Sequence, residues 1–148
     1  MADISALINY DQTFPVAIKN PVTGEDVGIT FNLVSMESER VAVVDKLIDT
    51  ERWQAVFESK DKKLTPEMIA KFGDKAERER LIAAIDGWNW GGNEFGNLGA
   101  DPECNAENKR YVIEHPNARW IRSQLEAKAA DLVNFSQPSK KPARNTSK

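Results

Sequence analysis

Two stretches near the start of the chain alternate apolar and polar residues with the period of a β-strand. Residues 14–18 place Phe, Val and Ile on one face, and residues 27–33 place Val, Ile, Phe and Leu on one face. Between them, residues 20–24 (Asn-Pro-Val-Thr-Gly) predict a tight turn. The pattern therefore predicts a β-hairpin over residues 14–34. A lone hairpin is marginal in water, so its apolar face must lie against helices or against a partner's sheet.

After the hairpin the apolar period changes to that of amphipathic helices. Ser35 or Ser38 is a candidate N-cap for the first helix, and Thr65 followed by Pro66 is a strong start for the second. The apolar spacing predicts helices at about residues 36–58, 65–87, 105–115 and 117–135. The expected fold class is α+β, with an N-terminal β-hairpin packed on a mainly α-helical bundle.

Residues 87–96 (Gly-Trp-Asn-Trp-Gly-Gly-Asn-Glu-Phe-Gly) interrupt this helical pattern. Their glycine and asparagine content argues against a regular element, while their aromatic residues need burial. We expect at least one of Trp88 and Trp90 to face outward. Tryptophans beside glycines occur both as buried plugs of loops and as binding hot spots, and both interpretations stay open for this segment.

The length of 148 residues suits one domain, which we place at residues 1–135. Residues 136–148 contain two prolines and four basic residues but no acid, and are predicted to form a disordered basic tail. The net charge of −3 gives no strong indication of a partner. The first residues do not look like a secretory signal, and no apolar stretch approaches the roughly 20 residues needed to span a bilayer. We therefore expect a soluble, cytosolic protein with no membrane partner.

Side chains for catalysis or metal binding are scarce, with one cysteine, Cys104, and one histidine, His115. We interpret both as incidental, and no HExxH or CxxC spacing indicates a metal site. Asp86 lies in an apolar run, where a buried carboxylate would be a candidate for acid–base chemistry; we favour the alternative that it caps or hydrogen-bonds the glycine-rich turn. We expect no enzyme activity, no catalytic residue, no cofactor and no metal.

Phosphate-binding and nucleic-acid-binding signals are also weak. The glycines at residues 91–96 match neither GxxxxGK[ST] nor GxGxxG. Lys140, Lys141, Arg144 and Lys148 give the tail a positive charge, but four cations on a flexible tail of an acidic protein provide only weak, salt-sensitive affinity. Nucleic-acid binding is therefore not expected.

The order of the motifs resembles that of the tail assembly chaperones of long-tailed bacteriophages. The segments that carry the resemblance are Phe-x-Val-x-Ile-x-x-Pro-x-Thr-Gly at residues 14–24, Ala-Ala-Ile-Asp-Gly-Trp at residues 83–88, a helix starting near Pro-Glu at residues 102–111, and Trp-Ile-Arg-x-Gln-Leu with Asn-Phe at residues 120–135. The loop between residues 88 and 102 departs from the family's pattern in its length and its content of Gly and Asn.

The resemblance implies a non-catalytic protein that binds the tape measure protein, and in some members of the family also tail tube subunits. It implies that the protein acts in the host bacterial cytoplasm and is absent from the mature virion. It also implies a longer frameshifted product, with which Lys140 and Lys141 are compatible. The alternative is a structural virion component, such as a small tail or head-tail connector protein. Exposed apolar helix faces are the expected contact surface, with Trp88, Trp90 and Trp120 as candidate protein-binding residues. A homo-oligomer formed through the hairpin's free edge or through helix faces is also expected.

Overall fold

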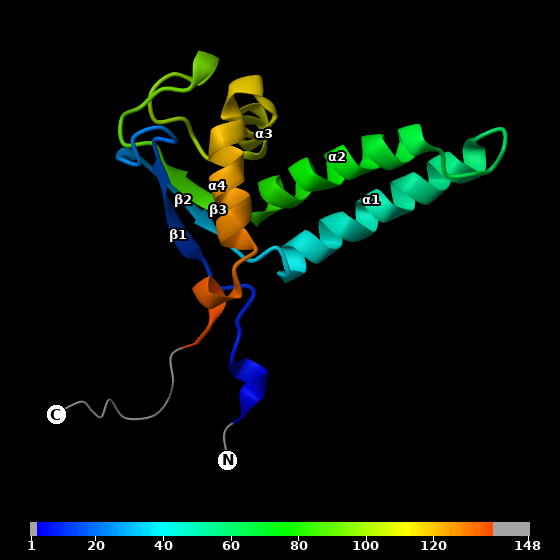
Figure 1. Cartoon of the computed structure of the whole chain (residues 1–148), viewed down its shortest axis with the longest axis horizontal. Coiled ribbons are helices and arrows are strands. Elements are labelled where there is room, and N and C mark those ends of the chain that lie inside the picture. Colours follow the sequence, from blue (N-terminus) through cyan, green and yellow to red (C-terminus); the bar gives the residue numbers. More distant parts are fainter. Residues whose placement is uncertain (1–2, 138–148) are drawn as a thin grey trace.

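A computed structural model of the chain describes residues 3–137. Its centre is an antiparallel three-stranded sheet in the order β1-β2-β3 (Figure 1), formed by β1 (Phe14–Lys19), β2 (Asp26–Leu33) and β3 (Ile85–Asn89). The α-helices are α1 (Glu39–Glu58), α2 (Pro66–Ala84), α3 (Ala106–Glu114) and α4 (Arg119–Ala129). Short 3-10 turns lie at Ile4–Ala6, Gly96–Leu98, Pro116–Ala118 and Leu132–Phe135. The fold class is α+β, as predicted.

The predicted β-hairpin is present, with β1 and β2 paired so that Phe14 lies opposite Leu33 and Val16 opposite Phe31. The turn is held by the side chain of Asn20, whose Oδ1 accepts hydrogen bonds from the backbone N–H groups of Val22 and Thr23 at 2.8 and 3.2 Å. Gly24 closes the turn with φ +78°, a conformation that favours glycine. The apolar face of the hairpin is buried, as the alternation required.

The sequence did not predict the third strand. We expected a helix as far as residue 87 and no regular element after it, whereas α2 ends at Ala84 and the chain continues directly as β3. Strand β3 forms because its backbone pairs with the edge of β2 that β1 leaves free. In this pairing Thr30 lies opposite Asn89 and Phe31 opposite Trp88. Pairing with a distant strand therefore overrides the weak local preference of Gly and Asn.

The inner face of the sheet carries the main core. Figure 1 shows α4 crossing in front of the strands, and α3 and the end of α2 lie beside it. Apolar side chains of the three strands pack against Trp90 and against side chains of α2, α3 and α4. The largest buried members are Trp90, Phe31, Ile18, Leu33, Ile85, Leu81, Ile113, Ile121 and Leu125. The sheet and these three helices thus form one body.

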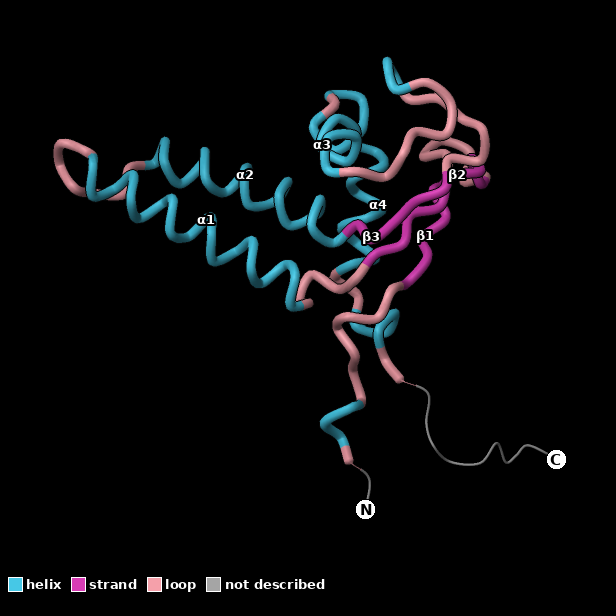
Figure 2. Tube along the Cα trace, turned by 180° about the vertical axis from the view of Figure 1, so that it is seen from behind, coloured by secondary structure: helices cyan, strands magenta, loops and turns pink. Residues whose placement is uncertain are grey.

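Helices α1 and α2 form an antiparallel hairpin that projects from this body as an arm, which Figure 2 shows from behind. Helix α2 begins as predicted, because Thr65 Oγ1 accepts a hydrogen bond from the backbone N–H of Met68 at 3.1 Å and Pro66 occupies the first turn. Ser38 is the N-cap residue of α1, although its side chain makes no capping hydrogen bond. Helix α1 packs mainly against α2, whereas α2 also contacts α3, α4 and β3.

The predicted helix at residues 117–135 is wrong in its extent. Helix α4 ends at Ala129, and a separate turn, Leu132–Phe135, starts where Asp131 accepts a hydrogen bond from the N–H of Val133 at 3.2 Å. Residues 136 and 137, which we assigned to the tail, pair with the N-terminal segment, since the N–H of Gln137 donates to the C=O of Leu7 at 2.8 Å. The predicted disorder of the remaining tail, and its four basic residues, lie outside the described residues.

Across residues 3–137, no helix has the length and apolar character needed to cross a bilayer.

Candidate interaction surfaces

Trp88 and Trp90 both point to the inner face of the sheet. The expectation that at least one of them faces outward is therefore wrong. Residues two positions apart on an extended strand share a face. Trp90 is only 1% exposed, and Trp88 is half-buried, with its Nε1–H donating to the C=O of Pro102 at 2.8 Å. Their rings meet edge to face, with centroids 5.6 Å apart. The buried-plug interpretation is therefore the correct one for Trp90, which has no surface to offer a partner.

The glycine-rich segment after Trp90 is a structured cover over this aromatic cluster. Asn93 donates from Nδ2 to the carbonyl oxygens of Val27 and Trp90, at 3.1 and 2.8 Å, and the N–H of Gly92 donates to Asp101 Oδ1 at 2.7 Å. The ring of Phe95 continues the cluster, 5.7 Å from the ring of Trp90. The segment therefore packs over and shields the aromatic cluster, and it does not form a phosphate-binding loop.

The sparse chemistry-bearing residues do not come together as a site. Cys104 is half-buried against the core, and burial raises the pKa of its thiol, which disfavours the nucleophilic thiolate. His115 Nδ1 accepts a hydrogen bond from the N–H of Asn117 at 3.1 Å, and its ring packs against that of Phe95 with centroids 4.9 Å apart. Within residues 3–137, no group of three or more His, Cys, Asp or Glu is arranged to hold a metal ion.

Asp86 is neither a buried acid nor a cap of the glycine-rich turn, so both sequence interpretations of it are wrong. Its side chain is exposed and accepts a hydrogen bond from Arg40 of α1 at 2.9 Å. Gly87 lies opposite Asn32 and Ile85 opposite Leu33, so Asp86 is the extra residue where the register of the two strands shifts. Such a bulge lets Ile85 and Trp88 both face the core while the side chain of Asp86 points to solvent. The residue therefore links the arm to the body.

Trp120, the third candidate residue, lies in an apolar groove between edge strand β1 and helix α4. The groove has a volume of about 790 Å³. Phe14 and Pro15 from β1 and Trp120 and Ala127 from α4 give it apolar walls, while Lys19 and Lys128 supply positive charge. Trp120 is half-buried, so part of its ring packs on the core and part remains accessible in the groove.

One end of the groove is fixed by Gln124. Its side-chain Nε2 donates to the C=O of Lys19 at 2.8 Å, and its Oε1 accepts from the N–H of Lys19 at 2.8 Å. Farther along the same strand, Pro15 has no N–H to donate. Since β1 is an edge of the sheet, these two residues leave it with fewer free backbone groups for a further strand.

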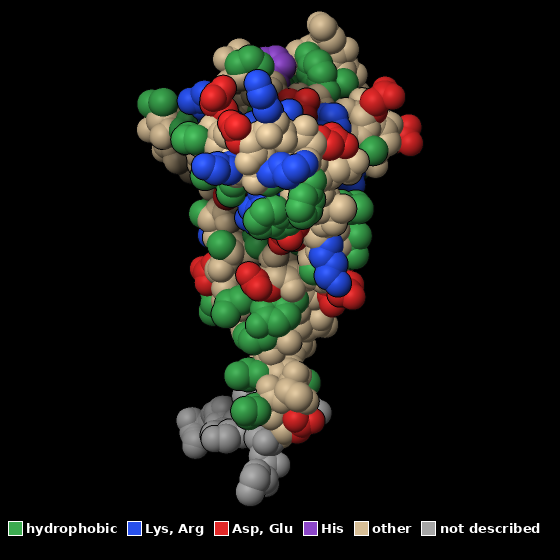
Figure 3. Space-filling view, turned by 90° about the vertical axis from the view of Figure 1, so that its right-hand side faces the viewer, with side chains coloured by type: hydrophobic (Ala, Val, Ile, Leu, Met, Phe, Trp, Pro, Cys, Tyr) green, Lys and Arg blue, Asp and Glu red, His purple; other side chains and the backbone are tan. Residues whose placement is uncertain are grey.

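A second apolar surface lies on the arm. Helix α1 carries exposed side chains of Val43, Leu47, Trp53 and Phe57, and Figure 3, which looks onto the end of the arm, shows hydrophobic side chains gathered there among charged ones. The apolar spacing predicted an amphipathic helix here without separating its buried apolar residues from its exposed ones. The available signal was that they occupy two opposite faces at 3.6 residues per turn, of which only the face with Val41, Ile48 and Val56 is buried.

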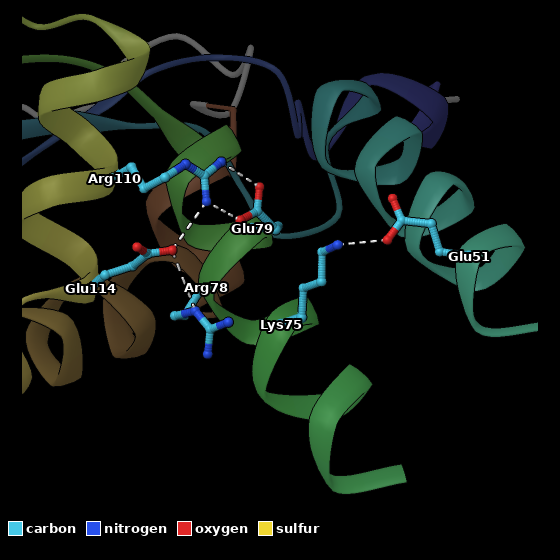
Figure 4. Close-up of polar contacts among 6 residues, drawn as sticks. All are labelled: Glu51, Lys75, Arg78, Glu79, Arg110 and Glu114. Atoms are coloured by element: carbon cyan, nitrogen blue, oxygen red, sulfur yellow. Dashed lines mark hydrogen bonds and ion pairs between the residues drawn. The ribbon is translucent and has the colours of Figure 1, made fainter. Parts of the chain in front are cut away.

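Ion pairs join the elements around the arm (Figure 4). Arg110 of α3 bonds both carboxylate oxygens of Glu79 of α2, one of them at 2.8 Å, and also Glu114 at 3.1 Å. Lys75 of α2 pairs with Glu51 of α1 at 2.6 Å. The hydrogen bond from Arg110 lowers the pKa of Glu79, and in return Glu79 raises the pKa of Arg110. These contacts hold the root of α2 against α3 and the middle of α2 against α1.

Trp120 was predictable from the sequence as a candidate residue, but the rest of its groove was not. Phe14 belongs to the predicted hairpin and Ala127 to the predicted last helix, so the missing information was that these two elements lie side by side.

Comparison of the chain with protein-family models, with curated proteins and with solved structures finds no match in any of the three.

Proposed function

We propose that the protein is a non-catalytic phage tail assembly chaperone that binds an amphipathic helix of the tape measure protein in the groove between β1 and α4. The chaperone acts in the host bacterial cytoplasm and leaves before the virion is complete. The observation that carries the proposal is the preformed apolar groove with the partly accessible Trp120 in its wall.

The dimensions and lining of the groove suit a short stretch of helix. Helix α4 has 11 residues, which corresponds to a wall of roughly 16 Å, or about three turns of a client helix. The apolar walls match the apolar stripe of an amphipathic helix. Lys19 and Lys128 suit acidic residues that flank such a stripe. A large aromatic ring with an accessible face, such as Trp120, is a typical anchor in such an interface.

The edge strand favours a helical client over an extended one. A peptide that adds a strand to a sheet needs the backbone N–H and C=O groups of the edge. Gln124 already bonds both backbone groups of Lys19, and Pro15 offers no N–H. Recognition through side chains therefore remains available in this groove, which agrees with a client that keeps its own backbone hydrogen bonds.

A non-catalytic role is supported by the state of the reactive side chains. The raised pKa of Cys104 works against a thiolate, His115 is packed among aromatic rings, and Asp86 is paired with Arg40 on the surface. Many exchangeable apolar contacts also suit a partner that must later be displaced by assembly, because affinity is tuned mainly through dissociation rates.

Co-expression tests the proposal directly. The client is the long helical protein encoded beside this chain, expressed alone and together with it. We expect the client to aggregate alone and to be soluble and co-purified in the presence of the chain. A client that is soluble alone and is not co-purified would contradict the proposal. Mass spectrometry of purified particles separates the alternative, since a structural virion component would be present in particles and a chaperone absent from them.

A further inference from the structure

The outer face of α1 has a pattern that fits a second copy of itself. Val43 and Phe57 lie seven residues on either side of Thr50, and Leu47 and Trp53 lie three residues on either side of it. All four apolar side chains are 45–67% exposed, and Thr50 is exposed between them. The apolar positions are thus symmetric about Thr50 along a helix of 20 residues, which is about 30 Å long.

We propose that two copies of the chain associate through this face, with the two α1 helices antiparallel and Thr50 on the two-fold axis. An isologous interface requires that a residue and its contact exchange roles between the copies. In this register Val43 of each copy faces Phe57 of the second copy, and Leu47 faces Trp53. Each contact therefore pairs a smaller aliphatic side chain with a larger aromatic one, which is the alternation that fills the space between packed helices.

The charges beside the apolar residues agree with the same register. Lys46 lies level with Trp53 of the second copy, where its ammonium group can lie over the indole ring. Arg40, which bonds Asp86 of its own copy, also lies within about one helical turn of Glu58 of the second copy, on the same flank of the interface, so opposite charges lie close together. A parallel arrangement would instead place each aromatic residue against its own counterpart and each charge against a like charge.

The shape of the arm allows this association. Helix α2 covers the opposite face of α1 through Val41, Ile48 and Val56, and no element within residues 3–137 covers the outer one. Pairing two arms would give four helices in the order α2-α1-α1-α2, in which α1 is buried on both faces. The groove at Trp120 is lined by β1 and α4, which lie in the body away from the outer face of α1 (Figure 1), so this dimer does not use it.

Sedimentation of the full chain over a wide concentration range tests the dimer. We expect a monomer–dimer equilibrium for the native chain, and a dissociation constant about tenfold higher or more for Leu47→Glu or Phe57→Glu. Val22→Glu is the matched control, since Val22 is 91% exposed in the β1–β2 turn and should not change the equilibrium. Circular dichroism establishes that each variant is folded. A native chain that is monomeric throughout, or dimers unaffected by both α1 substitutions, would overturn the proposal.

Disulfide cross-linking tests the register. In a Cys104→Ser background, Thr50→Cys should form a disulfide between copies on mild oxidation, because facing Cα atoms of helices packed 8–10 Å apart approach to about 4–6 Å. Val43→Cys should not, because the two copies of that residue lie about 21 Å apart along the antiparallel pair. Efficient cross-linking of Val43→Cys would instead mean a parallel pair. Both assays need no client, so their failure leaves the proposed chaperone function open, and failed client binding leaves the dimer open.

Discussion

The side-chain amide of Gln124 bonds both the N–H and the C=O of Lys19, each at 2.8 Å. The two residues are 105 positions apart in sequence, so this pair fastens the last helix to the first strand. It also fixes the distance between the two walls of the groove that contains Trp120. The geometry of the proposed client site thus depends on one glutamine.

Replacing this glutamine should loosen the groove. We expect Gln124→Ala to lower the free energy of unfolding by about 1 kcal/mol, because both hydrogen bonds to Lys19 are lost while the freed backbone groups of the exposed Lys19 can still bond water. Urea denaturation measures the change. Gln54→Ala is the control, since Gln54 makes one long surface bond of 3.3 Å to Glu58 and its loss should change little. Equal stabilities of the two variants would mean that the Gln124 contact does not fasten the wall.

The Glu79–Arg110 pair should make stability depend on pH. Arg110 lowers the pKa of Glu79 in the folded protein, so the pair stabilises the fold above the pKa of the unfolded chain, and this contribution is lost as pH falls through the folded pKa. At neutral pH we expect Glu79→Gln to lower the free energy of unfolding by about 0.5–1 kcal/mol. The effect is modest because the side chain of Arg110 is 45% exposed and water screens its charge.

The measurement is urea denaturation of both chains from neutral to acid pH. The stability difference between Glu79→Gln and the native chain should shrink as pH falls. Glu25→Gln, an exposed residue of the β1–β2 turn, should show little difference at neutral pH. A difference for Glu79→Gln that is constant over the whole range would show that the carboxylate charge is not its source.

Two glycines should respond to alanine in opposite ways. Gly96 has φ +56°, and a Cβ there would lie 2.3 Å from the hydroxyl oxygen of Tyr111, so Gly96→Ala should destabilise the protein by about 1–3 kcal/mol. Gly73 lies inside α2 with open space around it, so Gly73→Ala should stabilise it by about 0.5–1 kcal/mol. Thermal unfolding compares the two. Destabilisation by both substitutions would mean that Gly73 has a packing role that its surroundings do not show.

Cys104 should react slowly with alkylating reagents. Burial raises the pKa of its thiol, so at neutral pH less thiolate forms than in an unfolded chain. The rate of alkylation against pH should therefore be displaced to higher pH in the folded protein, and denaturation should remove the displacement. An identical profile in the folded and the denatured chain would contradict the burial of this thiol.

The sequence predicted the local elements better than their partners. The hairpin at residues 14–34 and the start of α2 at Thr65 follow from short-range rules of alternation, turn chemistry and capping, and both are confirmed. Strand β3 was missed because Ile82 and Ile85 continue the spacing of a helix, and the strand is decided by its long-range pairing with β2.

The candidate site shows the same division. Trp120 was recognisable as a large aromatic residue of an amphipathic helix, but its groove depends on β1 lying beside α4, which no local pattern contains. Trp90 was a candidate as a tryptophan beside glycines, yet it packs against Phe31 and Trp88 and is 1% exposed. Residue type therefore identified candidate anchors, and only the packing of the sheet against the helices separated the accessible one from the buried one.

The proposed function depends on the groove at Trp120 binding an amphipathic helix of the tape measure protein. The most direct test is the dissociation constant of a helical tape measure fragment for the native chain and for Trp120→Ala, measured by calorimetry with folding checked by circular dichroism. We predict that Trp120→Ala raises this constant about tenfold or more, that Trp120→Phe largely preserves binding, and that Ile69→Ala on the arm leaves it unchanged. Equal affinity of the native chain and folded Trp120→Ala would contradict the account.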